Sequence, residues 1–154
     1  MLKSGMASWK AKFNRLDAAI IHGMRVYGIT LLRIALAIVF IWFGALKIFR
    51  VSPVSDLVAQ TVYWVPAKFA VPFLGVWEVI IGVGLLAGRA LRTILFLMFL
   101  QMSGTFLVLV LHPELSFQNG NPFKLTTIGE FVIKNIVLIS AGLVVGSTVK
   151  RPLE

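Results

Sequence analysis

The fold is decided by residues 71–111, which read VPFLGVWEVIIGVGLLAGRALRTILFLMFLQMSGTFLVLVL. Two long apolar runs, 71–88 and Leu91–Leu111, are joined here by a tight turn. At about 1.5 Å per residue, a helix of this length crosses a hydrocarbon layer about 30 Å thick. Similar runs at 27–49 and 128–149 flank the pair, so the sequence predicts an all-α bundle of four transmembrane helices.

The composition agrees with a membrane protein. Hydrophobic residues make up 58% of the chain and charged residues 14%, and the mean hydropathy is +0.92. Four spans and their connections use nearly all 154 residues, which leaves no room for a soluble catalytic domain. We therefore expect no enzyme activity from the chain on its own. We also expect the net charge of +9 to face membrane lipid and not nucleic acid.

The basic residues outside the spans or at their very ends are distributed unevenly between the two sides of the predicted bundle. One side carries nine of them and the other three. This asymmetry predicts that both termini are cytoplasmic and that the loops 50–70 and 112–127 face outward. The nine are Lys3, Lys10, Lys12, Arg15, Arg25, Arg89, Arg92, Lys150 and Arg151; the three are Arg50, Lys68 and Lys124.

Cysteine is absent, so the chain has no thiolate for catalysis, iron–sulfur ligation or redox relay. His22 and His112 fall on opposite sides of the predicted bilayer and cannot ligate one haem within a subunit. We expect no metal site and no covalent cofactor. A redox role would require a partner protein or a diffusible cofactor to carry the electrons.

Residues 1–26 lack the compact apolar core of a signal peptide. Their apolar side chains recur every three or four residues, and the lysines lie largely off this stripe. The pattern predicts an amphipathic helix in the cytoplasmic interface, with a disordered basic tail as the alternative. The domain division is then 1–26, a bundle at 27–149 and a cytoplasmic tail at 150–154. The stripe consists of Met6, Trp9, Phe13, Leu16 and Ile20.

The connecting loops and the glycines give weaker signals. Residues 54–65 predict a short helix on the outer interface, with Tyr63 and Trp64 in the aromatic belt, and 112–127 predict an irregular loop. Two pairs of glycines have the GxxxG spacing that allows close helix packing in membranes. These are Gly84 with Gly88, and Gly142 with Gly146.

Ionisable side chains lie inside three of the four spans. Burying a charge in lipid costs about 2.5–3.5 kcal/mol, so such residues usually face one another or a cavity. By depth, Lys47, Glu78, Glu130 and Lys134 share the outer half of the bilayer, and we expect Glu78 to lie within reach of Lys47, Lys134 or Arg33. The candidate polar cluster is Arg33, Lys47, Glu78, Gln101, Glu130, Lys134 and Asn135.

Two interpretations of the cluster remain open at this point. One is a structural ion-pair network that fixes helix register, with Lys47 and Glu130 reaching toward the surface. The other is a ligand pocket or a proton path that opens toward the outer leaflet.

Three sequence patterns in these spans resemble the DoxX-like membrane proteins, over about residues 27–149. Within that superfamily they are most similar to the YkgB/RclC-type inner-membrane branch. That branch often has Asp where this chain has Asn135, so the resemblance supplies no acidic partner for Lys134. The patterns are Arg33 followed by aromatic–Gly44–x–x–Lys47, then Gly75–x–x–Glu78–x–x–x–Gly82, and finally Gly129–x–Phe131–x–x–Lys134–Asn135.

The resemblance implies a four-helix bundle in a bacterial cytoplasmic (inner) membrane, with a partner membrane protein or a second copy. It also implies a non-catalytic subunit of a quinone-linked redox or oxidative-stress system, with quinone or lipid as the bound molecule. A structural or assembly subunit of a larger membrane complex is the alternative. A small proton-coupled transporter is a third interpretation, for which four spans leave little room.

Overall fold

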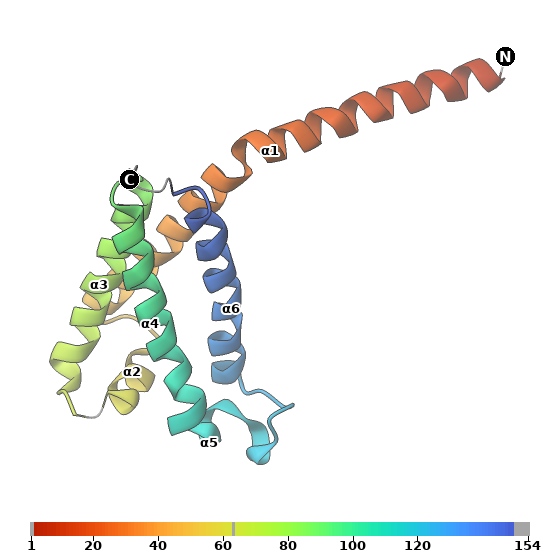
Figure 1. Ribbon diagram of the computed structural model, residues 1–154. Coiled ribbons are helices and arrows are strands. Elements are labelled where there is room, and N and C mark those ends of the chain that lie inside the picture. The colour runs from red at the N-terminus through yellow and green to blue at the C-terminus, as the bar shows by residue number, and fades with distance from the viewer. Residues whose placement is uncertain (1, 63, 150–154) are drawn as a thin grey trace. The chain divides into compact units, whose positions relative to one another are not determined.

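The computed structural model describes residues 2–62 and 64–149. Within this part of the chain every named element is a helix, so the predicted all-α class is confirmed (Figure 1). The predictions for Tyr63, for the tail 150–154 and for the side chains of Lys3 and Met6 lie outside it. The elements are α1 (Leu2–Ile48), α2 (Ser55–Thr61), α3 (Ala67–Ala87), α4 (Leu91–Leu111), α5 (Pro113–Ser116), the 3₁₀ helix η1 (Gln118–Gly120) and α6 (Thr127–Gly146).

The chain divides within α1 into two compact units, one up to Leu32 and one from Arg33 onward. The first unit is a single helical segment, without a break at residue 26. Trp9, Phe13 and the other described residues of the predicted stripe are exposed in it. The candidate span within α1 is Lys12–Ile48, whose 37 residues exceed the roughly 20 that a helix needs to cross a membrane. The location of the stripe in the interface stays a prediction.

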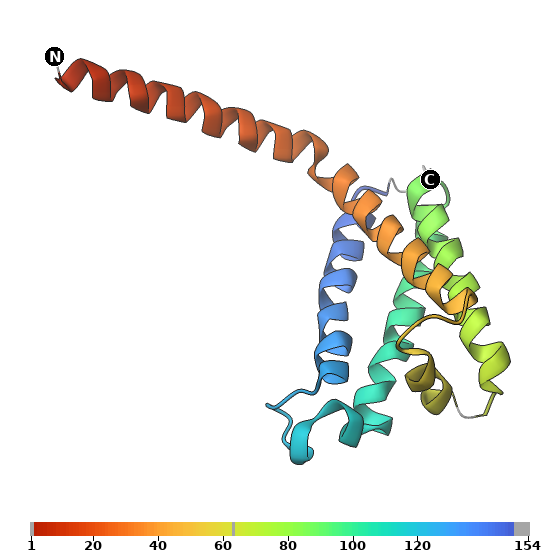
Figure 2. The ribbon, with the colours of Figure 1, turned by 180° about the vertical axis from the view of Figure 1, so that it is seen from behind.

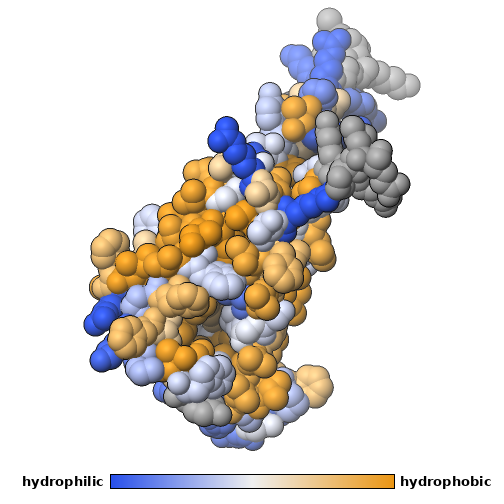
Figure 3. Space-filling model, turned by 60° about the vertical axis from the view of Figure 1, so that its left-hand side comes forward, coloured by the Kyte–Doolittle hydropathy of each residue, from blue (hydrophilic) through white to orange (hydrophobic). Residues whose placement is uncertain are grey.

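Four helices, namely α1, α3, α4 and α6, are long and apolar enough to cross a membrane, as predicted. The face in Figure 3 carries mostly apolar side chains over these helices. The start of α3 differs from the prediction, since it lies at Ala67 and not at residue 71. Pro66 precedes the first turn, and Pro72 within the helix removes only one backbone hydrogen bond. The last span ends at Gly146, before the predicted 149.

In the second unit, α1 and α3 run antiparallel, as Figure 2 also shows, and glycines form their contact. A Cβ atom added at Gly44 would lie 2.5 Å from the carbonyl oxygen of Gly75. One added at Gly82 would lie 2.8 Å from the carbonyl oxygen of Ala37. The two helix backbones therefore touch directly at these positions.

The predicted GxxxG glycines have different roles. Gly84 of α3 faces Ile94 of α4, and Gly142 of α6 faces Met98 of α4, so both allow close helix packing. Gly146 packs more loosely near the same helix. Gly88 differs from the other three, because it has a φ of +67° and ends α3 as its left-handed cap, with the Arg33 guanidinium of α1 against it.

The connection from α4 to α6 is more ordered than predicted. Thr126 ends it as the N-cap of α6, where its side-chain oxygen accepts a hydrogen bond from the Gly129 amide at 3.1 Å. A bridge between Phe117 and Leu125 closes the loop. At its start, the pKa of Glu114 is lowered by its own backbone amide and by a hydrogen bond with His112.

Candidate ligand-binding site

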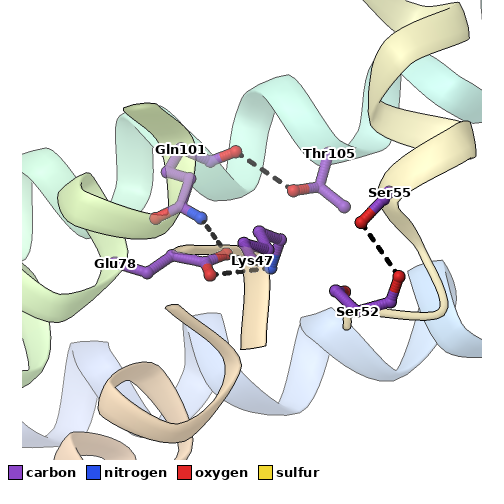
Figure 4. Close-up of polar contacts among 6 residues, drawn as sticks. All are labelled: Lys47, Ser52, Ser55, Glu78, Gln101 and Thr105. Carbon is purple, nitrogen blue, oxygen red and sulfur yellow. Dashed lines mark hydrogen bonds and ion pairs between the residues drawn. The ribbon is translucent and has the colours of Figure 1, made fainter. Parts of the chain in front are cut away.

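Three helices bring Lys47, Glu78 and Gln101 together inside the second unit (Figure 4). The Lys47 Nζ atom donates to both carboxylate oxygens of Glu78, at 2.9 and 2.7 Å. The Gln101 Nε2 atom donates to Oε1 of the same carboxylate at 2.5 Å. The side chains of Lys47 and Glu78 are only 6% and 9% exposed, so this is a buried ion pair with a third, neutral partner.

The glycine contact between α1 and α3 explains why these side chains meet. Lys47 and Glu78 each follow a contact glycine, Gly44 or Gly75, by three residues. Side chains on a helix lean toward its N-terminus. On antiparallel helices the two side chains therefore lean toward each other across the glycine contact. The missing glycine side chains leave the space in which the pair forms.

The ion pair borders a cavity of about 530 Å³. This size is typical of sites for small organic molecules, which are likewise mostly apolar with a few polar groups. Side chains of α1, α2, α3, α4 and α6 line it, and most of them are aliphatic or aromatic. The aromatic ones are Phe40, Phe43, Trp64, Phe73, Trp77 and Phe131.

The polar groups at the cavity have hydrogen-bonding capacity left over. Lys47 uses two of its three N–H bonds on Glu78, and Gln101 uses one of its two. Asn135, which is 7% exposed, adds an amide from α6. The hydroxyls of Thr61 and Thr105 donate to carbonyls of their own helices, at 2.8 and 3.2 Å. The site therefore offers N–H donors to an acceptor on a bound molecule.

One further buried atom has no partner among the described residues, namely Oε1 of Gln101. With Glu78 ionised, the amide must direct its N–H₂ group at the carboxylate, which leaves its oxygen without a donor.

The structure separates three of the predicted residues, Arg33, Glu130 and Lys134, from this site. Glu130 and Lys134 pair with each other at 3.6 Å along α6, with side chains 57% and 74% exposed. The expected convergence is wrong for both, because α6 faces the cavity with the neighbouring positions Phe131, Val132 and Asn135. Residues at the same depth in the membrane can still lie on the inward face of one helix and the outward face of another.

Arg33 is also remote from Lys47, Glu78 and Gln101. Its guanidinium lies against Gly88, at the opposite end of α3 from the contact between Gly44 and Gly75. Ten residues of helix, about 15 Å, separate Gly88 from Glu78. Of the three bases expected to reach Glu78, Lys47 is the one that does.

Sequence reasoning missed the contribution of α2, which lines the cavity with Leu57, Val58 and Thr61. It also missed the aromatic lining, which has no signature in an apolar span. One signal was present, since the patterns Gly–x–x–Lys and Gly–x–x–Glu have equal spacing and opposite charges.

Comparison with known proteins gives one match. The protein-family model described as DoxX matches residues 28–112, which is more than half of the chain. The matched part contains Lys47, Glu78 and Gln101 and ends just beyond α4. No curated protein and no solved structure matches.

Proposed function

The chain belongs to the DoxX family, and from that premise we propose that it is a non-catalytic membrane subunit that holds a quinone or a similar lipid-soluble carbonyl compound. The observation that carries the proposal is the apolar cavity of about 530 Å³ that ends on Lys47, Glu78 and Gln101. The likeness to the YkgB/RclC-type branch favours an oxidative-stress or quinone-linked system in a bacterial inner membrane.

The chemistry of the site suits a quinone ring. Its carbonyl oxygens accept hydrogen bonds, and Lys47 and Gln101 have N–H bonds left to donate. Aromatic walls such as Trp77 and Phe131 suit a flat ring, and the exposed apolar surface around the helices suits an isoprenoid tail. Reduction to the quinol needs two protons and two electrons. In the proposed system a partner protein supplies the two electrons. Glu78 accepts hydrogen bonds from Lys47 and Gln101 as a carboxylate, so both protons would have to come from solvent.

The test is retention of quinone by the purified protein. Lipid extracts of wild type and variants would be compared by mass spectrometry after gentle detergent extraction. We expect Gln101→Leu to retain about tenfold less quinone, since one hydrogen bond to a bound ligand contributes about 1–1.5 kcal/mol. Lys134→Met is the control, because Lys134 lies outside the cavity and should not affect retention.

Wild type without quinone, together with a co-purifying protein partner, would contradict the proposal and favour the assembly subunit. Equal loss in Gln101→Leu and Lys134→Met would place the quinone elsewhere.

We propose further that both termini are cytoplasmic. Ser55→Cys and Asn119→Cys should then react with an impermeant thiol reagent in intact cells, because this orientation puts the start of α2 and η1 on the outer side. A cysteine at Ala90, in the α3–α4 turn, should be protected until the cells are opened. Labelling at Ala90 with protection at the other two positions would reverse the orientation.

A further inference from the structure

The Arg33 side chain has no counter-charge in the described part of the chain. Its guanidinium covers the backbone of Gly88, so closely that a side chain at that position would collide with it. Its Nε atom is enclosed and has no hydrogen-bond partner among the described residues. A charged group within a membrane span normally pairs with an anion or a polar group.

No carboxylate of the described part of the bundle lies at this end. Asp56 is in α2, Glu114 is in α5 and Glu130 is in the first turn of α6, so all three belong to the opposite end. Glu78 is engaged by Lys47. Arg89, which is exposed, directly follows Gly88 in the turn. The α3–α4 end of the bundle is therefore strongly positive.

We propose that Arg33 and Arg89 bind the phosphate of an anionic phospholipid at the α3–α4 turn. The adjoining surface of α3 is apolar and exposed at Val83 and Leu86, as expected where acyl chains lie. The first turn of α4 has no side-chain cap, because Ala90 occupies the N-cap position. The positive end of the α4 helix dipole adds to the charge of the two arginines at this end of the bundle.

The competing explanation is that Arg33 only neutralises the carbonyl end of α3, to which Gly88 is the cap. That role would stabilise the helix without selecting a lipid. The two explanations differ in whether the lipid bound depends on its headgroup charge.

The experiment uses the full chain in nanodiscs with equal amounts of phosphatidylglycerol and phosphatidylcholine, followed by native mass spectrometry of retained lipid. We expect wild type to retain phosphatidylglycerol preferentially. Arg33→Gln should reduce that retention about fivefold, the scale of one basic residue at a membrane surface. Arg33→Lys should recover part of it. Arg50→Gln, which removes an exposed arginine just after the other end of α1, should leave it unchanged.

Three outcomes would overturn the proposal. Equal retention of both lipids by wild type would show that no anionic site exists. Unchanged retention in Arg33→Gln with a lower melting temperature would leave only the helix-capping role. Equal loss in Arg50→Gln would show that total charge decides retention. If Arg33→Gln does not fold, lipid retention is measured for Arg89→Gln, which changes an exposed residue of the turn. We expect this variant to lose phosphatidylglycerol.

Discussion

Replacing Lys47 by methionine is expected to lower the free energy of unfolding by about 3–5 kcal/mol. The change leaves the Glu78 carboxylate buried without its cation, and removal of one partner of a buried ion pair has a cost of this size. Both oxygens of Glu78 lose a hydrogen bond at once, because Lys47 donates to each of them. Gln101 is neutral and cannot replace the charge.

The double variant Lys47→Met with Glu78→Gln is the informative comparison. Removing both charges removes the uncompensated one, so we expect much of the lost stability to return. The measurement is equilibrium unfolding in mixed micelles for wild type, both single variants and the double variant. The matched control is the same pair of changes at Lys134 and Glu130, which are exposed and should contribute about 0.5 kcal/mol or less. A double variant as unstable as the sum of the single ones would contradict a coupled pair.

The four spans could be predicted from the sequence because run length and hydropathy do not depend on tertiary contacts. Their ends could not. The second span is predicted to begin at residue 71, whereas α3 begins at Ala67, directly after Pro66, and continues through Pro72. The order in the loop after α4 depends on Thr126, whose hydroxyl contacts both Leu115 and Gly129.

The residues of the candidate site could be predicted only in part from the sequence. Counting residues from a span boundary gives depth, and depth correctly brought Lys47 near Glu78. Depth gives no information about which face of α6 turns inward, so it wrongly predicts that Glu130 and Lys134, which are exposed, belong to the cluster. The cavity depends on how α2 and α6 pack against the other helices, and no local pattern records that packing.

The contact between α1 and α3 likewise could not be predicted from a local sequence pattern. A GxxxG search looks for two glycines on one helix, but the contact between α1 and α3 uses Gly44 from one helix and Gly75 from the other. Only the matching positions of Gly44 before Lys47 and of Gly75 before Glu78 hint at it.

Gly44→Ala is therefore expected to destabilise the bundle by about 3 kcal/mol, the upper part of the range for overpacking. The new methyl group would lie 2.5 Å from the carbonyl oxygen of Gly75 and 2.9 Å from the amide nitrogen of Val79. Both are backbone atoms, so no rotamer change can make room and α1 must move away from α3. The movement would also separate Lys47 from Glu78.

The matched control is Gly104→Ala in α4, where an added Cβ meets nothing within 4 Å. Both changes replace glycine by alanine inside a helix, and each gains about 0.5–1 kcal/mol of helix propensity. The difference between their unfolding free energies in the same micelles therefore isolates the backbone collision. Equal stability of the two variants would show that α1 and α3 do not touch at Gly44. The space that holds the Lys47–Glu78 pair would then need another explanation.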